Sequence, residues 1–519
     1  MSQQKEIELK LELPPGNVGA LDRLSFLKGI KPAKAKTLLS VYFDTSDQKL
    51  RRKGVSLRIR RVDGRHLQTI KQRGNPSIGL FSRDEWECDV EGRQPDLDAA
   101  RGTVLEPLLS KKLRRNLKPI FETRVRRQIY PVRRGASEIE LSIDRGKVEA
   151  AGASSPLCEM ELELKKGEPG ELFEIVRALG DAVPVKLAIE DKAGQGYDLM
   201  AEAAPPPVRA EPIALASDHS WSTSFQVIAR ARLHQIAANE TALRDGDFGA
   251  VHQMRIGIRR LRAAISVFKE TLAGPQTEAM KKQLKWLAGE LGSVREIDVF
   301  IKRVTKEAKS ENADRAGVGS MIRDLEQRRR RAMGRAKNAV ASAHYRCLLI
   351  DAAAWMEAGD WLLDDDESRR TLREQPARTA AATELRRRWK KIRKRGAKFA
   401  KLDARRRHRL RIVTKKLRYA SEFFTSVFHS KKSIRRRKNF IIKLEAMQDA
   451  LGDLNDIVVQ DRLARDAIEP LATRRGELAA RKAFAAGRLS GRETARFQSV
   501  EKDAKRTFGA FAKAPPFWE

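Results

Sequence analysis

The segment EIELKLEL at residues 6–13 decides how the N-terminal part of the chain folds. Its even positions, Glu6, Glu8, Lys10 and Glu12, are all charged, and its odd positions are all apolar. Because alternate side chains of a β-strand point to opposite faces, this two-residue period is typical of a strand. We therefore expect a strand with one charged face and one apolar face.

Four further segments repeat this alternation. They lie at residues 55–60, 121–126, 138–144 and 159–165, and turn signals such as Asp63-Gly64 separate some of them. Glu122, Arg124 and Arg126 share one face of their segment. The pattern predicts an antiparallel sheet in which each strand carries charge on one side.

A change of composition predicts a domain boundary. Residues 201–218 are rich in Ala and Pro, and the three consecutive prolines at 205–207 prevent regular structure. After this segment the period becomes helical, because Met254, Ile258, Leu261 and Ile265 recur at steps of four and three. We expect a strand domain at 1–200, a linker at 201–218 and an all-helical domain at 219–519.

The helical part contains an internal repeat. VHQMRIGIRRLR at 251–262 and RHRLRIVTKKLRY at 407–419 both place a histidine three residues before a cation, with further cations at the same offsets. About forty residues later, LGSVRE at 291–296 matches LGDLND at 451–456. Two matched pairs in the same order indicate duplicated helical units.

Net charge is the strongest global property of the chain. The 519 residues carry a net charge of +36. Residues 1–204 hold 37 basic and 31 acidic side chains, whereas residues 205–519 hold 68 and 38. A basic field of this strength predicts a polyanionic partner for the helical part: nucleic acid, an anionic membrane surface or polyphosphate.

Several classes of protein are disfavoured. The three cysteines, Cys88, Cys158 and Cys347, are far apart and predict neither a disulfide framework nor a zinc site. The N-terminus lacks the apolar core of a signal peptide, and no apolar run is long enough to span a bilayer. These observations predict a cytoplasmic protein with no membrane partner.

The charged strand faces admit two interpretations. One is a solvated outer face, which is the ordinary role of charge on an antiparallel sheet. The other is a charged lumen that holds an anion with a divalent metal, because paired carboxylates such as Glu6 and Glu8 stay ionised only beside cations. The residues alone leave both open.

Motifs in residues 1–200 resemble the CYTH family of triphosphate tunnel metalloenzymes. The resemblance rests on ExExK at Glu6 to Lys10, YFDT at 42–45, SLRIRR at 56–61, RDEWE at 83–87, FETRVRR at 121–127, CEMELEL at 158–164 and EDKAGQGY at 190–197. It implies an eight-stranded antiparallel β tunnel that hydrolyses triphosphates with Mg²⁺ or Mn²⁺. In the last motif Gln195 stands where the family usually has arginine.

The resemblance also implies a set of site residues. Glu6, Glu8 and Lys10 are the catalytic candidates, and the metal candidates are Glu6, Glu8, Glu159, Glu161 and Glu163. Triphosphate binding falls to Lys10, Arg58, Arg60, Lys71, Arg83, Arg124, Arg126, Lys186 and Lys192.

The duplicated motifs of the helical part resemble the CHAD domain. That family implies two duplicated four-helix bundles that bind inorganic polyphosphate. By motif, the binding candidates are His252, Arg255, Arg259, Arg260, Arg262, His408, Arg411, Lys415, Lys416, Arg418 and Tyr419. The fold expected for the whole chain is thus a multidomain α+β one.

We therefore expect an enzyme that cleaves inorganic triphosphate to diphosphate and phosphate. We expect its helical domain to bind long-chain polyphosphate, which would place the enzyme at polyphosphate granules. No specific nucleic acid is expected, because aromatic residues make up only 6% of the chain and no base-stacking platform is visible. The alternatives are a non-catalytic polyphosphate-binding protein and, less favoured, a thiamine triphosphatase or a class IV-like adenylate cyclase.

Overall fold

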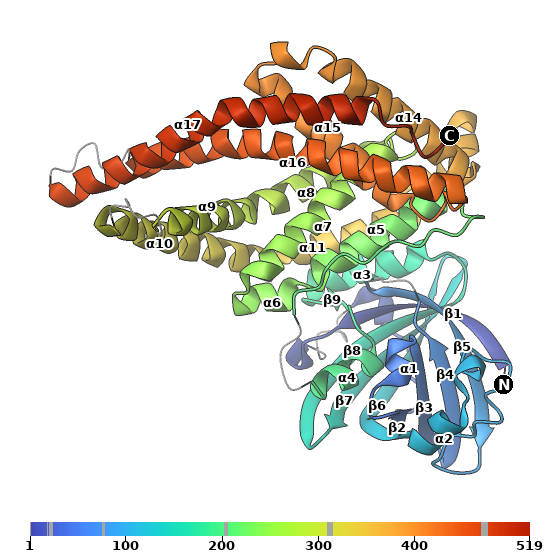
Figure 1. Cartoon of the computed structure of the whole chain (residues 1–519). Helices are drawn as coiled ribbons and strands as arrows, with labels where there is room; N and C mark the ends of the chain where they lie inside the picture. Colours follow the sequence, from blue (N-terminus) through green and yellow to red (C-terminus); the bar gives the residue numbers. More distant parts are fainter. Residues whose placement is uncertain are drawn as a thin grey trace. The chain divides into compact units, whose positions relative to one another are not determined.

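The computed structural model describes residues 2–17, 19, 24–74, 78–201, 206–308, 315–468 and 476–519. Contacts divide the chain into two units (Figure 1). The first comprises Met1–Val208, Leu233–Glu240 and Ala341–Asp360, and the second comprises Arg209–Arg232, Thr241–Val340 and Trp361–Glu519. Residues 206–216, in the predicted linker, form neither helix nor strand.

The first unit is built on an antiparallel sheet that closes on itself. In the part of the chain that the structure describes, the strand order is β5-β4-β3-β2-β6-β7-β8-β1, and β5 also pairs with β1. A short strand, β9, pairs with β1. The predicted antiparallel fold is confirmed, with β9 as an addition. The strands are β1 (Ser2–Glu12), β2 (Lys36–Asp44), β3 (Val55–Val62), β4 (Arg65–Gln72), β5 (Leu80–Val90), β6 (Lys118–Arg134), β7 (Ser137–Ala150), β8 (Ala153–Lys166) and β9 (Lys186–Leu187).

The turn between β3 and β4 follows from its two residues. Asp63 has a φ of 49° and Gly64 a φ of 83°. Positive φ at both central positions is the backbone of the two-residue hairpin that Asp-Gly favours. The sequence signal therefore fixes the register in which β3 pairs with β4.

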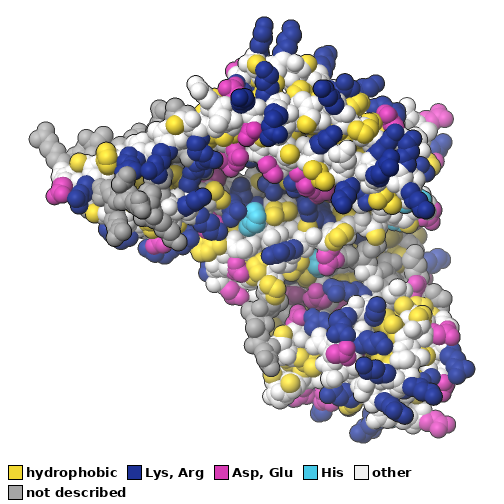
Figure 2. Space-filling model, in the orientation of Figure 1, with side chains coloured by type: hydrophobic (Ala, Val, Ile, Leu, Met, Phe, Trp, Pro, Cys, Tyr) yellow, Lys and Arg dark blue, Asp and Glu magenta, His cyan; other side chains and the backbone are white. Residues whose placement is uncertain are grey.

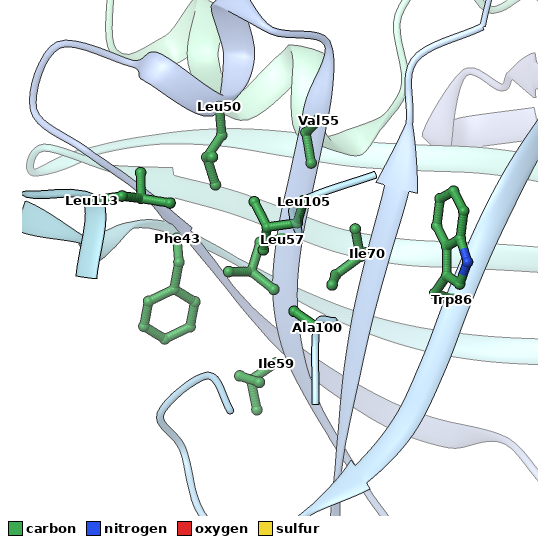
Figure 3. Packing of buried hydrophobic residues seen from close by; sticks show 10 residues of the cluster. All are labelled: Phe43, Leu50, Val55, Leu57, Ile59, Ile70, Trp86, Ala100, Leu105 and Leu113. Atoms are coloured by element: carbon green, nitrogen blue, oxygen red, sulfur yellow. The ribbon is translucent and has the colours of Figure 1, made fainter. Parts of the chain in front are cut away.

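The apolar outer face of one half of the sheet is covered by the segment after β5. Phe43, Leu57 and Ile59 on β2 and β3 are buried against Leu105 and Leu113 of this segment (Figure 3). The segment includes the helix α2 (Lys111–Asn116), and α1 (Lys49–Arg52) adds Leu50 to the same cluster. With the apolar side chains packed outside, the charged faces of these strands are left to the interior of the ring.

The helix α4 (Lys192–Leu199) packs against the inner side of β6 and β7. Asp191 caps its N-terminus by accepting a hydrogen bond from the amide of Gly194. Gly196 lies so close to the ring of Phe121 that a Cβ there would meet it at 2.2 Å. Tyr197 donates to Asp44 at 2.7 Å, which joins the EDKAGQGY and YFDT motifs.

The helix α3 (Gly170–Ala182) and the helix α11 (Ala343–Ala358) also belong to the first unit. Leu172, Phe173 and Val176 of α3 are fully buried, and so are Ile350 and Ala353 of α11. The two helices pack against each other, and α11 also contacts β9. The core of the first unit therefore includes residues from beyond position 340.

Within its described residues, the second unit is built of helices and connecting segments, with no strand. The helices between the linker and the C-terminus are α5 (Trp221–Ala237), α6 (Glu240–Asp245), α7 (Phe248–Val267), α8 (Pro275–Glu290), α9 (Gly292–Ala308), α10 (Arg315–Ala341), α11, α12 (Asp360–Leu363), α13 (Glu367–Glu374), α14 (Ala377–Gly396), α15 (Ala404–Phe423), α16 (Lys431–Ile468) and α17 (Glu477–Ala512). Together with the sheet, this confirms an α+β protein with a helical C-terminal part.

The two copies of the repeat start in the same way and diverge later. Asp247 caps α7 and Asp403 caps α15, each just before the motif that carries a basic stripe. The first stripe is His252, Arg255, Arg259 and Arg262, and the second is His408, Arg411, Lys415 and Arg418. The first LG pair lies where α8 ends and α9 begins, whereas the second lies inside the single long helix α16. The duplication is thus visible in the helices as well as in the sequence.

Candidate functional site

A charged cavity of about 240 Å³ lies inside the closed sheet of the first unit. Seven of its lining side chains are basic and six are acidic, so their charges nearly cancel. The basic ones are Lys10, Arg58, Arg60, Lys71, Arg127, Lys165 and Lys192, and the acidic ones are Glu8, Glu85, Glu87, Glu161, Glu163 and Asp191. Such a lining cannot form a packed core, and it suits an anion accompanied by cations.

The cavity brings together eight of the residues predicted for the triphosphate site. They are Glu8, Lys10, Arg58, Arg60, Lys71, Glu161, Glu163 and Lys192. They come from β1, β3, β4, β8 and α4, which are far apart in the sequence. Of the two interpretations that the strand faces allowed, the structure favours the charged lumen.

The pairing of β1 with β8 places the first and last glutamate motifs side by side. Glu8 is opposite Glu163, and Lys10 is opposite Glu161. The Lys10 ammonium lies 3.1 Å from Glu8 Oε2 and 2.6 Å from Glu161 Oε1. Lys10 therefore neutralises carboxylates on both strands, as the ExExK spacing requires.

A second buried lysine holds the floor of the cavity together. The ammonium of Lys192 lies 2.9 Å from Asp144 Oδ2, 2.8 Å from Glu159 Oε2 and 2.8 Å from Glu161 Oε1. Burial alone would lower the pKa of Lys192, but these carboxylates raise it well above its ordinary value. Its side chain is only 6% exposed, so Lys192 acts as an internal counter-ion.

Glu161 is the most heavily neutralised carboxylate of the site. It accepts hydrogen bonds from Lys10, Lys192 and Arg127. Burial would raise its pKa, but the three cations hold the pKa well below its ordinary value. Glu161 is therefore ionised at neutral pH and positions the surrounding cations.

The arginines of β3 differ in how far they are neutralised. Arg58 lies 3.6 Å from Glu85, which also pairs with Lys71 at 2.7 Å. Arg60 donates to the Ser40 hydroxyl at 3.2 Å, and no ion pair to it occurs within the described ranges. Burial, followed by the positive charges of Arg58 and Arg127, lowers the pKa of Arg60 to about 10. Of these cations, Arg60 is thus the one whose charged form an incoming anion would stabilise most.

Other predicted residues are not brought to the cavity. Arg124 and Arg126 lie on the opposite face of β6, where Arg124 is 58% exposed. Lys186 pairs with Glu240 at 2.8 Å, and Glu159 is buried behind the lining, where it accepts a hydrogen bond from Gln195. The side chains of Glu6 and Arg83 lie outside the described part of the structure.

The reason for the misplaced arginines is that the inner face of β6 changes character along its length. Phe121 and Val125 point inward and pack with Tyr197 of α4. Two residues further along that face, Arg127 enters the cavity and pairs with Asp144 at 2.6 Å. The resemblance places Arg124 and Arg126 in the triphosphate site, but their more charged face of β6 is exposed to solvent.

The structure adds lining residues that the sequence analysis did not assign. They are Tyr42, Ser56, Glu85, Glu87, Arg127, Lys165, Asp191 and Ala193. Tyr42, Glu85 and Glu87 stand inside the YFDT and RDEWE motifs, so position within those motifs was the available signal.

The donor chemistry of the cavity suits a hard divalent cation at one place. Glu8 and Glu163 face each other across β1 and β8 and both line the cavity, and carboxylate oxygens are the ligands that Mg²⁺ and Mn²⁺ prefer. Among the described side chains, no three His, Cys, Asp or Glu residues converge as a complete metal site. Since Mg²⁺ commonly keeps water and phosphate ligands, two carboxylates fit such an ion.

The second unit brings the two predicted basic stripes together. Arg259 and Arg260 of α7 lie 5.8 and 5.6 Å from the ring centre of Tyr419 on α15. Burial and then the positive charges of Arg411 and Arg259 lower the pKa of Lys415 to about 8. Cations from both copies of the repeat therefore lie close enough to repel each other.

The second stripe contacts the LG motif that follows it, and the first contacts the end of α8 just before that motif. His408 Nδ1 is 2.7 Å from Asn455 Oδ1, and Arg411 is 3.9 Å from Asp456. In the first copy, Arg255 donates to the carbonyl of Ala288, just before the LG pair. Burial and then Arg295 lower the pKa of His252 to about 4, so His252 is uncharged at neutral pH.

Some predicted polyanion ligands are already paired. Arg260 lies 2.8 Å from Glu422, and Arg418 lies 3.0 Å from the same carboxylate. Lys416 lies close enough to Arg388 and Arg262 for their positive charges to lower its pKa, after burial. The described helices include none long and apolar enough to cross a membrane.

The fold and the sites define a protein with a charged cavity inside a closed sheet and a basic helical unit. The family model of the CYTH domain matches residues 4–197, and that of the CHAD domain matches residues 227–465. The chain therefore belongs to the proteins that carry a CYTH domain followed by a CHAD domain.

Two known proteins are similar to parts of the chain. An inorganic triphosphatase from Haemophilus influenzae is 32% identical over 197 residues, which are 37% of this chain and 54% of that protein. The chain thus spans about half the length of this relative. The crystal structure of the CHAD domain from the plant Ricinus communis is 30% identical, covers 60% of this chain and 99% of its own, and superimposes with a TM-score of 0.50.

Proposed function

We propose that the first unit hydrolyses inorganic triphosphate to diphosphate and phosphate with a divalent metal. The observation that carries this proposal is the cavity inside the closed sheet, which has seven basic side chains from strands β1, β3, β4, β6 and β8 and from α4. Support comes from the similarity to an inorganic triphosphatase over 197 residues.

The cations of the cavity have separate roles in this proposal. Arg60, which makes no ion pair within the described ranges, and Arg58 bind phosphate oxygens directly, and Lys71 does so from the neighbouring strand. Lys10 and Arg127 are anchored by carboxylates, so they meet the substrate without rearrangement. Lys192 stays paired with its three carboxylates and supports the other side chains of the cavity.

Metal dependence is proposed from the charge balance of the cavity. A triphosphate carries several negative charges, whereas the basic lining side chains outnumber the acidic ones by one. Cations that enter with the substrate would supply the missing positive charge. Glu8 and Glu163 would hold one such ion, which when bound polarises phosphate oxygens as a Lewis acid.

The test is phosphate release by the full chain. Tripolyphosphate, longer polyphosphate, ATP and thiamine triphosphate are compared with Mg²⁺, Mn²⁺ or EDTA. We expect tripolyphosphate to be the best substrate and EDTA to stop turnover. Preferred cleavage of thiamine triphosphate, or formation of cyclic AMP from ATP, would assign the cavity to one of the two less favoured activities instead.

A matched pair of variants tests the metal site. Glu8→Gln removes a carboxylate from the cavity, and Glu138→Gln makes the same change at an exposed position of β7. We expect Glu8→Gln to lower turnover by about a hundredfold or more, the range typical of a lost charge-stabilising group. The surface variant should behave like the wild type, and equal activity of both variants would contradict the assignment.

We propose further that the helical unit binds polyphosphate through the two stripes as one site. The proximity of Arg259, Arg411, Lys415 and Tyr419 supports this. Arg259→Ala with Lys415→Ala should weaken the binding of long-chain polyphosphate and reduce its salt dependence, because fewer counterions are released. Arg328→Ala with Arg331→Ala is the control, since that run lies outside both stripes.

A binding protein without catalysis is the second candidate function. Gln195, at the position where the family usually has arginine, donates to Glu159 and does not line the cavity. If the cavity grips triphosphate without cleaving it, calorimetry will detect metal-dependent binding while no phosphate is released.

A further inference from the structure

Cations from two helices of the second unit, α14 and α15, gather around Ser266, near the end of α7. The Ser266 hydroxyl lies 3.2 Å from the Lys416 ammonium of α15 and 3.4 Å from a guanidinium nitrogen of Arg388 on α14. Arg388 also donates to the Ser266 carbonyl. A single hydroxyl group therefore brings together two cations that are 28 residues apart in the sequence.

Arg388 is held rigidly in this cluster. Its side chain is largely buried, and Glu384 accepts a hydrogen bond from it at 2.6 Å. Glu384 also pairs with Arg387 at 2.6 Å. One buried carboxylate thus serves two arginines.

The exposed side of α14 extends the cluster. Arg387, Lys391 and Arg395 recur at steps of four and so share a face of this helix, where like charges destabilise it. Within the described ranges, Arg262, Lys391, Arg395 and Lys416 form no ion pair. The row therefore carries a cost in stability that an anionic ligand would offset.

Mutual repulsion within the cluster supports this placement. Burial and then Arg388, Arg262 and Lys391 lower the pKa of Lys416. Burial and then Arg395 and Arg387 lower the pKa of Lys391. A surface on which cations lie this close is one where a bound anion would be stabilised.

The cluster continues the paired stripes. Ser266 lies one turn beyond Arg262 on α7, and Lys416 follows Lys415 on α15. From Arg259 to Ser266 the helix rises by roughly 10 Å. A flexible chain of phosphates that occupies the stripes can reach the cluster along these two helices.

The geometry points to a further phosphate subsite at Ser266, formed by Lys416, Arg388 and the row Arg387, Lys391 and Arg395 of α14. We propose that this subsite binds phosphate groups of the same long-chain polyphosphate that occupies the paired stripes. The inference rests on the polyphosphate binding proposed above. An ordinary solvated basic face would not converge on one buried arginine and one hydroxyl. Lys and Arg side chains occur at many places on the visible face of the helical unit (Figure 2), so a matched control is essential.

The test uses two pairs of changes on the same helix. Lys391→Ala with Arg395→Ala removes two cations of the row, and Lys390→Ala with Lys394→Ala removes two exposed lysines about 100° around α14 at the same spacing. The full-length variants are titrated calorimetrically, in EDTA and at two salt concentrations, with long-chain polyphosphate, tripolyphosphate and single-stranded DNA. EDTA suppresses hydrolysis, and anion binding in the sheet cavity is the same in both variants.

We expect the row variant to bind long-chain polyphosphate roughly fivefold more weakly at low salt, while the control changes by less than about twofold. The slope of log affinity against log salt should fall by about 1.4 in the row variant, since each lost contact to a flexible phosphate chain contributes about 0.7. Affinity for tripolyphosphate should not change, because it is too short to reach from the stripes to Ser266.

Equal losses in the row and control variants would overturn the subsite, as would an equal loss for tripolyphosphate. Tighter binding of DNA than of polyphosphate at matched phosphate concentration, with the same dependence on the row, would assign the subsite to nucleic acid. Failure of the wild type to bind long-chain polyphosphate would instead overturn the proposed function of the helical unit, and this inference with it. Weaker polyphosphate binding in Arg259→Ala with Lys415→Ala, but not in Lys391→Ala with Arg395→Ala, would overturn only the subsite.

Discussion

Lys192→Met tests whether the floor of the cavity is held by one buried lysine. The ammonium of Lys192 contacts Asp144, Glu159 and Glu161, all within 2.9 Å. Methionine has a similar length but no charge, so three buried carboxylates lose a counter-ion. Removing one partner of a buried ion pair typically costs about 3–5 kcal/mol, and we expect the free energy of unfolding to fall by that amount at pH 7.

The effect should depend on pH with a definite sign. The pKa values of Glu161 and Asp144 are lowered in the folded protein, so their stabilisation is present above about pH 4 and is lost as pH falls through the folded values. The raised pKa of Lys192 means that its own contribution persists up to and above about pH 10. Without Lys192 the carboxylates ionise less readily, so the difference between wild type and variant should narrow as pH falls from 7 toward 3.

Urea unfolding combined with hydrogen exchange of the β7 and β8 amides measures this locally. Lys36→Met is the control, because Lys36 is 49% exposed and pairs with Asp63, which is 65% exposed. It should cost less than about 1 kcal/mol. A cost for Lys192→Met no larger than that of the control, or a difference that widens on acidification, would refute the counter-ion role.

Three further predictions follow from the two units. Arg60→Ala should raise the KM for tripolyphosphate in the phosphate-release assay by about tenfold to a hundredfold, with unchanged stability. Arg124→Ala, at an exposed position, should match the wild type. Equal effects of the two changes would contradict the placement of Arg60 inside the cavity and of Arg124 outside it. Since the pKa of Lys415 is about 8, its charge is lost as pH rises through that value. Polyphosphate affinity measured by calorimetry should therefore fall between pH 7 and 9, and Lys415→Arg should make that affinity less dependent on pH. An unchanged pH dependence in the variant would count against a role of Lys415 in binding. Ile350→Ala on α11 should destabilise the first unit by about 2–4 kcal/mol and speed hydrogen exchange in α3. Unchanged hydrogen exchange in α3 would mean that α11 does not support this helix.

The alternating strands could be predicted because their side-chain period is local. EIELKLEL and the glutamates of 159–163 were predicted to share a site, and the structure places β1 beside β8 with Glu8 opposite Glu163. Strand pairing between residues so far apart cannot be derived from either segment alone. The order of motifs supplied that information.

The arginines of β6 could not be placed because local charge does not tell which face is inward. Phe121 and Val125 occupy the inner face at one end of the strand, where α4 packs against them. Only the tertiary packing of α4 decides that Arg127 enters the cavity while Arg124 and Arg126 remain outside. Lys186 was misplaced for a related reason, since its partner Glu240 lies beyond the linker.

The helical repeat was predicted well because each copy carries its own period. The packing of α7 against α15, which brings Arg259 close to Lys415 and Tyr419, could not be derived from either copy alone. The inclusion of α11 in the first unit could not be foreseen, because an apolar helix carries no sign of which core it will join.

The most direct test of the proposed function is phosphate release from tripolyphosphate by the full chain, followed with and without Mg²⁺ or Mn²⁺, for the wild type and for Glu8→Gln. We predict metal-dependent turnover that yields one phosphate per triphosphate in the wild type and nearly none in the variant. Metal-independent turnover that survives in Glu8→Gln, or tight binding with no release of phosphate under any metal, would contradict it.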